Sequence, residues 1–181
     1  MPELTVRVLE EEDWLIYREV RLAALEESPS VFGDTYDREA AADQTHWRSQ
    51  VTAARRVVAE SDGSLCGVVS VGDFPLEPGA MELFDLWVEP TARSTGVAGR
   101  LVDTAATLAA DEGATQLYSW AGTENGPAIG FATGFGFRIS SRRRPVTVGD
   151  HALGDTEVAL VLPLVDDPHI VPNATAGRLR R

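Results

Sequence analysis

The chain has 181 residues, 44% of them hydrophobic, a length and composition typical of one globular domain with a sizeable core. Asp and Glu outnumber the basic residues by 28 to 16, and every basic residue is Arg, so the formal net charge is -12. This charge excludes nucleic acid as an expected partner and favours cationic molecules such as amines. We expect the domain to span residues 1–165 and a flexible tail to follow at residues 166–181, where prolines and charges show no periodicity.

The single cysteine, Cys66, cannot form a disulfide within the chain, and the residues after Met1 show no basic region followed by an apolar run. We therefore expect a cytoplasmic protein. No stretch has the length of a transmembrane helix, so no membrane partner is expected. Histidine and cysteine do not cluster, so no metal site is predicted. The oligomeric state stays open between monomer and homodimer.

The first half of the chain alternates between strand-like and helix-like apolar patterns. The pattern predicts a strand, two helices and a hairpin of two strands over residues 4–9, 10–27, 37–54, 56–60 and 65–71. An acidic first turn favours the start of the first helix, and Ser28 with Pro29 ends it. The hairpin turn at residues 61–64 contains Asp followed by Gly, a strong turn signal.

The second half continues the alternation. The pattern predicts strands over residues 81–88, 115–120, 138–141, 145–148 and 157–162, a helix over residues 96–112 and a shorter helix after Asn125. Gly113 is a typical cap after the longer helix. The run Arg142, Arg143 and Arg144 indicates a solvated hairpin or loop, so it is left outside the predicted site.

A turn of small residues, which we call the phosphate turn, joins the strand at 81–88 to the helix at 96–112. Its sequence is RSTGVAG over residues 93–99. The first amides of a helix have no acceptor within it and lie at its positive end, so they suit a pyrophosphate, to which Arg93 adds charge. A Walker-type loop would need a lysine, and a dinucleotide fold would need repeated parallel units where a hairpin is predicted.

The phosphate turn resembles the signature of the GNAT family of N-acetyltransferases, in which Gln or Arg is followed by two residues, Gly, one residue, and Gly or Ala. Arg93, Gly96 and Ala98 match this signature. Residues 87–90 are similar to the family's strand end, and residues 125–137 to its second helix and the Gly–Phe pair that follows. The resemblance covers residues 4–162. It implies an α/β fold with a central, mostly antiparallel mixed sheet of six to seven strands and about four flanking helices.

The resemblance also implies acetyl-CoA as the co-substrate and an amine, expected to be a small molecule, as the acceptor. In this family the strand end bonds the pantetheine arm, the turn amides take the pyrophosphate, and the asparagine holds the pantetheine side and keeps two strands apart. The implied acetyl-CoA-binding residues are Leu86, Trp87, Val88, Arg93, Ser94, Thr95, Gly96, Val97, Ala98, Gly99 and Asn125. Asn125 also suits the cap of a helix.

Amine acetylation requires a neutral amine, which implies a base or a water chain to one. Glu82 matches the base position of the family's histone-modifying branch, and Asp85 lies closer to the phosphate turn. Their separation of three residues predicts opposite faces of a regular strand, so that only one of them serves.

Many family members carry a tyrosine seven residues after the asparagine, as the acid for the leaving thiolate. Ala132 stands there in this chain, which leaves water or Tyr118 as the acid. Two alternatives to a small-molecule enzyme remain open: a sensor that binds acyl-CoA without turnover, and an acetyltransferase for protein amino termini or lysines.

Overall fold

The computed structural model describes residues 3–28, 36–148 and 151–165, so the predicted tail at 166–181 lies outside the described residues. The strands are β1 (Leu4–Val8), β2 (Arg55–Ser61), β3 (Ser64–Asp73), β4 (Ala80–Val88), β5 (Gln116–Gly122), β6 (Arg138–Val148) and β7 (His151–Pro163). The helices are α1 (Trp14–Glu27), α3 (Tyr36–Ala40), α4 (Gln44–Ala53), α5 (Val97–Asp111) and α6 (Gly126–Phe135), with 3-10 turns η1 (Glu11–Asp13) and η2 (Pro90–Ala92).

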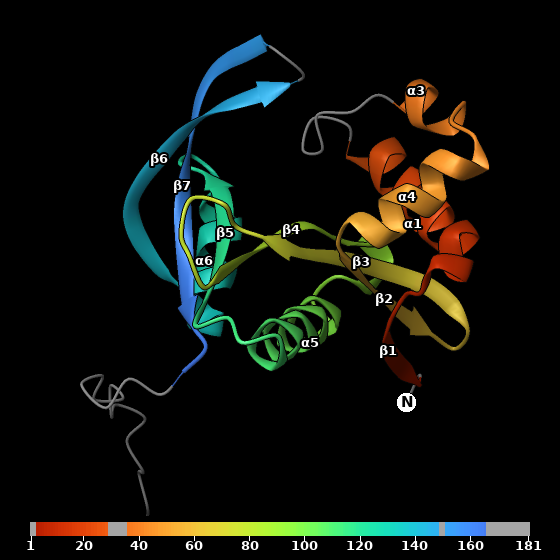
Figure 1. Ribbon diagram of the computed structural model, residues 1–181, viewed down its shortest axis with the longest axis horizontal. Helices are drawn as coiled ribbons and strands as arrows, with labels where there is room; N and C mark the ends of the chain where they lie inside the picture. Colours follow the sequence, from red (N-terminus) through yellow and green to blue (C-terminus); the bar gives the residue numbers. More distant parts are fainter. Residues whose placement is uncertain (1–2, 29–35, 149–150, 166–181) are drawn as a thin grey trace, which may run out of the picture.

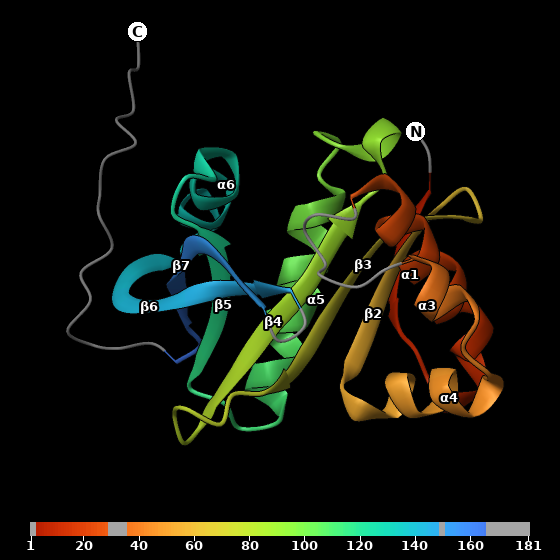
Figure 2. The same ribbon diagram turned by 90° about the horizontal axis from the view of Figure 1, so that it is seen from above.

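The seven described strands form one sheet in the order β1-β2-β3-β4-β5-β7-β6 (Figure 1). The pair β4–β5 is parallel, and the other neighbouring pairs are antiparallel. Helices α1, α3 and α4 cover one face, and α5 and α6 cover the other (Figure 2). This arrangement confirms the predicted mostly antiparallel mixed sheet flanked by helices.

Alternating side chains along the strands build a core on each face of the sheet. Val57 and Val69 pack in the cluster that contains α5, whereas Val58 and Val68 pack in the cluster that contains α1 and α4. A Cβ on Gly67 would lie 2.9 Å from a methyl carbon of Leu101, so this glycine allows α5 to lie close against β3. Burying a side chain such as Leu101 contributes about 2–3 kcal/mol.

Strands β4 and β5 separate soon after they begin. Their register pairs Ala80 with Gln116 and continues only to the pair Glu82 and Tyr118. Beyond that pair the two strands diverge, and we call this opening the fork. The fork places the second half of β4 next to a space on its β5 side.

The prediction of one continuous helix over residues 37–54 is wrong. The stretch is divided into α3 and α4, because the Asp43 side chain accepts a hydrogen bond from the His46 backbone N–H at 2.9 Å and caps a new helix. An Asp in the middle of a helical pattern offers its carboxylate to nearby amides, so it favours a cap over a helix interior.

The predicted loop at Arg142, Arg143 and Arg144 is also wrong. These residues belong to β6, which runs without interruption across the two short strands that the pattern predicts. Pairing with β7 holds Arg143 opposite Val158 and Arg144 opposite Glu157, and Arg142 lies within the irregular stretch between Ile139 and Arg143. Three successive charged residues lack the apolar alternation of a strand. Their place in a strand therefore becomes evident only from the pairing of β6 with β7.

Candidate active site

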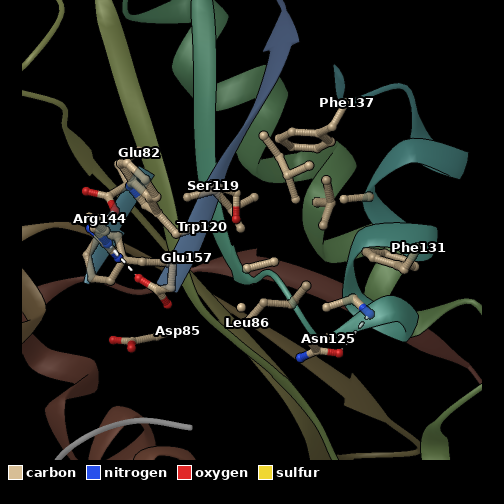
Figure 3. A pocket seen from close by; sticks show the side chains of 18 residues that line it. Glu82, Asp85, Leu86, Ser119, Trp120, Asn125, Phe131, Phe137, Arg144 and Glu157 are labelled. Carbon is tan, nitrogen blue, oxygen red and sulfur yellow. Dashed lines mark hydrogen bonds and ion pairs between the residues drawn. The ribbon is translucent and has the colours of Figure 1, made fainter. Parts of the chain in front are cut away.

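A cavity of about 370 Å³ lies at the fork (Figure 3). Strands β4 and β5 supply its walls, and its lining includes residues from both faces of the sheet. On the side of α5 and α6 these residues are mostly apolar, among them Val102, Ala132 and Leu160. On the opposite side they are charged, among them Glu82 and Arg144. The cavity therefore joins an apolar end to a polar end.

Asn125 lies at the apolar end and begins α6. Its side-chain oxygen accepts a hydrogen bond from the Ala128 backbone N–H at 3.1 Å, which confirms the predicted cap. Phe131 lies at the same end (Figure 3), and its neighbour Ala132 also lines the cavity. Ala132 is nearly buried, and the cavity extends to it without a tyrosine hydroxyl. The other candidate acid, Tyr118, is absent from the lining among the described residues.

Tyr118 packs in a separate cluster near the start of the fork. Its ring stacks on Phe74 with the centroids 4.4 Å apart, and its hydroxyl donates to the side-chain oxygen of Gln116 at 3.4 Å. These contacts make Tyr118 part of the core and give no support for it as the acid.

Glu82 occupies the polar end of the cavity at the last residue pair before the fork. Its side chain is only 20% exposed, and burial raises the pKa of its carboxyl above the usual range. The Arg144 guanidinium, 3.6 Å from the carboxylate, opposes this rise. The carboxylates of Glu157 and Asp85 reinforce it. A carboxylate with a raised pKa is a stronger base than one in water.

Asp85 lies at an irregularity in β4. Its φ of 54 falls in the left-handed region, and the pairing with β3 shifts register between Val68 and Ser70. The extra residue reverses the alternation, so Asp85 returns to the face that Glu82 occupies, and both line the cavity (Figure 3). The prediction that the two carboxylates lie on opposite faces is therefore wrong, because it assumed a regular strand.

Two buried arginines contact Asp85. Arg21, on α1, lies 3.3 Å from one carboxylate oxygen, and Arg56, on β2, lies 3.8 Å from the other. Arg56 also donates to the Ser70 hydroxyl at 2.6 Å and lies over the Tyr17 ring. The Asp85 carboxylate thus offsets the positive charges of one arginine on α1 and one on β2.

The phosphate turn has the open backbone that an anion needs. Ser94 and Gly96 have φ values of 65 and 93, and Gly96 is the N-cap of α5. A Cβ on either Gly96 or Gly99 would meet no atom within 4 Å. The predicted residues 94–99 therefore gather at the start of α5, with free space at the Cβ positions of Gly96 and Gly99.

Arg93 is fixed against neighbouring elements. Its Nε donates to the Val88 carbonyl at 3.0 Å, and its guanidinium pairs with Glu27 on α1 at 2.8 Å. Trp87 donates its indole N–H to the same Glu27 carboxylate at 3.0 Å. Hydrogen bonds from Ser28 and Trp87, with the charge of Arg93, lower the pKa of Glu27. Arg93 therefore ties the phosphate turn to the end of β4 and to α1.

Three residues of the polar end are missing from the site that the sequence predicts: Trp120, Arg144 and Glu157. The sequence places Arg144 in a loop and the other two in strands, without a role. The guanidinium carbon of Arg144 lies 4.2 Å from the centroid of the Trp120 ring, and its Nε is 2.6 Å from Glu157. The sequence feature that could have indicated this part of the site is Glu157, a charged residue directly before the apolar run at 158–162.

Within residues 3–28, 36–148 and 151–165, no three His, Cys, Asp or Glu side chains lie together in a way that suits a metal ion. No helix in the described part of the chain is long and apolar enough to span a membrane.

A mixed sheet opened at its parallel pair, with a glycine-containing turn leading into the next helix, is the arrangement that the resemblance to the acyltransferases of the GNAT family implies. The model of the acetyltransferase (GNAT) family matches residues 17–137, and the chain belongs to this family. Members of the family use acetyl-CoA. No curated protein sequence gives a significant match.

Solved structures agree with this fold. An N-acetyltransferase from Staphylococcus aureus Mu50 is 19% identical, with a TM-score of 0.66 over 90% of this chain and 99% of that chain. The yncA protein of Salmonella typhimurium, solved with its cofactor acetyl-CoA, is 20% identical, with a TM-score of 0.65 over 94% and 98%. Nourseothricin acetyltransferase is 26% identical, with a TM-score of 0.55 over 62% and 66%.

Proposed function

We propose that the protein transfers the acetyl group of acetyl-CoA directly to an amine and that Glu82 is the general base. One observation carries the proposal: a single cavity joins the apolar end at Asn125 to the half-buried carboxylate of Glu82. Such a cavity allows a thioester and an amine to meet from opposite faces of the sheet.

The residues present fit acetyl-CoA. Leu86, Trp87 and Val88 lie beyond the last residue pair of β4 with β5, and the β5-facing edge of this stretch would pair with the pantetheine arm as a strand does. The Val88 carbonyl at this edge also accepts a hydrogen bond from Arg93. The amides of the phosphate turn would hold the pyrophosphate at the positive end of α5. Asn125 would contact the pantetheine while it caps α6. The bound co-substrate supplies the activated acetyl group.

Glu82 would remove a proton from the acceptor ammonium, which leaves a neutral amine with a free electron pair. The amine nitrogen forms a bond to the acetyl carbonyl carbon, the carbon–sulfur bond breaks, and coenzyme A leaves as a thiolate. The nitrogen, which now carries one proton too many for an amide, releases that proton to water. A thiol has a pKa of about 8.5, so a proton from water suffices for the thiolate at neutral pH. The presence of Ala132 in place of a tyrosine is therefore compatible with turnover.

We assign Asp85 a positioning role instead of the base role. Its carboxylate already pairs with Arg21 and Arg56, both of which are buried. A proton on Asp85 would weaken both ion pairs and leave excess positive charge between α1 and the sheet. Glu82 has one ion pair, with the half-exposed Arg144, and can take a proton at lower cost.

The test is release of free thiol from acetyl-CoA with a broad panel of acceptors, followed by mass spectrometry of the product. The panel holds small amines, nourseothricin and peptides with free amino termini or lysines, because a solved relative is a nourseothricin acetyltransferase. Thiol release with an amine and an amide product would support the proposal. Tight binding of acetyl-CoA with no acetylated product across the panel would contradict it and favour a sensor.

A further inference from the structure

Four side chains from four strands meet at the polar end of the cavity (Figure 3). Arg144 on β6 lies over the ring of Trp120 on β5, with 4.2 Å between guanidinium carbon and ring centroid. Its Nε is 2.6 Å from Glu157 on β7, and its Nη1 is 3.6 Å from Glu82 on β4. We call the space between Glu82, Glu157 and the Trp120 ring the cation seat. A guanidinium occupies the cation seat in this structure.

Arg144 reaches the cation seat from a distance. Strands β7 and β5 lie between β6 and β4, so its side chain crosses the face of the fork to contact Glu82. The side chain is 44% exposed, and ion pairs with this degree of exposure contribute little to stability. Arginine also regains rotamer freedom when it leaves such a contact. Another cation can therefore replace it at low cost.

We propose that the cation seat binds an acceptor that carries a second positive charge beside the reacting amine, and that Arg144 is its intramolecular competitor. The inference rests on the proposed function, because Glu82 serves in it as the base. The class of acceptor is a small diamine or a larger molecule with two neighbouring cationic nitrogens.

The charges that face the seat support a dication. Asp85 is balanced by Arg21 and Arg56 on its other side. When Arg144 withdraws, the carboxylates of Glu82 and Glu157 have no other ion-pair partner among the described residues, which matches two positive charges on an acceptor.

The chemistry of the transfer leads to the same acceptor class. Once Glu82 has taken the proton of the reacting nitrogen, that nitrogen and Glu82 are both neutral. Glu157 keeps its negative charge, and the Trp120 face still favours a cation. A monoamine then carries no positive charge for Glu157 and Trp120 to bind, whereas a diamine keeps one on its second nitrogen. Glu157 and Trp120 would hold the second nitrogen while the first reacts.

A binding experiment tests the seat without turnover. Calorimetry with the full chain and saturating coenzyme A would compare 1,4-diaminobutane with n-butylamine at pH 7. We expect the diamine to bind at least about tenfold more tightly, because hydrogen bonds to a charged partner are strong. Equal affinity for the two amines would overturn the inference.

Variants then test the competitor. Arg144→Gln should bind the diamine about two- to fivefold more tightly, because the seat is no longer partly occupied. Glu157→Gln should weaken diamine binding about tenfold and leave n-butylamine little changed. Arg143→Gln is the matched control: it removes the same charge from β6, and the Arg143 side chain hydrogen-bonds only to the backbone of Ser140 and Arg142 among the described residues. Diamine binding that is unchanged or weaker in Arg144→Gln would overturn the competitor role.

Two further measurements keep the result interpretable. Circular dichroism would check that Arg144→Gln folds, and Arg144→Met would replace it if it does not, because a methionine keeps apolar contact with the Trp120 ring. Thiol release with both amines separates the two proposals. Diamine binding without any acetylation would contradict the proposed function but not the binding of a diamine at the cation seat. Equally efficient acetylation of both amines would contradict the inference but not the proposed function.

Discussion

Glu82 and Asp85 lie on the same face of the sheet, three residues apart in a strand that would otherwise direct them to opposite faces. The left-handed backbone of Asp85, between the paired segments of β4, brings them together. One carboxylate faces the cavity with a raised pKa, and the other pairs with two buried arginines. The two carboxylates thus have different surroundings, so substitution of Glu82 and substitution of Asp85 should have different effects.

Glu82→Gln should lower turnover by about a hundredfold to ten-thousandfold at neutral pH, because it removes the proposed base without changing shape. Binding of acetyl-CoA, measured by calorimetry, should be unchanged. Part of the lost rate should return at higher pH, where more of the amine is already neutral. Wild-type turnover across the pH range would show that Glu82 is not the base.

Asp85→Asn should lower the free energy of unfolding by about 1–3 kcal/mol, since Arg21 and Arg56 lose a charged partner. The loss of turnover should stay well below the hundredfold expected of a missing base. Urea titration and thiol release on the same preparation would measure both effects. A stable variant with no activity would reverse the roles of the two carboxylates.

Glu82→Gln should also raise the free energy of unfolding at pH 7. The pKa of Glu82 is higher in the folded chain than its ordinary value of 4.5, so its stabilising contribution is present at low pH and is lost as pH rises through the folded pKa. The neutral glutamine avoids that loss. Urea midpoints of the two proteins should therefore differ at pH 7 and converge toward pH 4. A less stable variant at pH 7 would mean that the ion pair with Arg144 outweighs burial.

Gly96→Asp should abolish acetyl-CoA binding, because it adds bulk and negative charge beside the amides of the phosphate turn. Gly113→Asp is a matched control, since Gly113 also has a positive φ of 88 and no atom within 4 Å of its Cβ position. It lies beyond the opposite end of α5. Calorimetry should detect loss of binding in the first variant alone. Equal loss in both would indicate a general effect of backbone strain.

Asn125→Ala should lower stability by about 1 kcal/mol through loss of the α6 cap. It should also raise the KM for acetyl-CoA, if Asn125 contacts the pantetheine as proposed. Asn125→Asp keeps an oxygen for the Ala128 N–H, so it should retain stability and lose only the contacts of the amide group. Thermal melts with steady-state kinetics separate the two effects. A normal KM in both variants would limit Asn125 to capping.

Local sequence signals are sufficient for much of the fold. The Asp62–Gly63 turn forms with φ values of 49 and 79 and joins β2 to β3 as expected. Gly113 follows α5 as predicted, with a positive φ of 88. Gly96, predicted as the first residue of the helix, is instead its N-cap, because its backbone is left-handed. The phosphate turn can be predicted in the same local way, since small residues directly before a helix leave its first amides open to an anion.

The polar end of the cavity depends on contacts between distant segments. Glu82, Trp120, Arg144 and Glu157 come from four strands, and their meeting requires the sheet order with β7 between β5 and β6. No spacing in the sequence encodes that order. The irregularity at Asp85 is equally hidden, because Asp tolerates a left-handed backbone at a position where the pattern indicates a regular strand.

The fork also affects how the protein resists unfolding. Three residue pairs join the backbones of β4 and β5, so strands β5, β6 and β7 are attached to the rest of the sheet by a short seam. A pantetheine arm paired with β4 would lengthen that seam. Ligand at a hundredfold excess over its Kd adds about 2.7 kcal/mol to the free energy of unfolding. We therefore expect the resistance of the protein to proteolysis in a cell to rise and fall with the supply of acetyl-CoA.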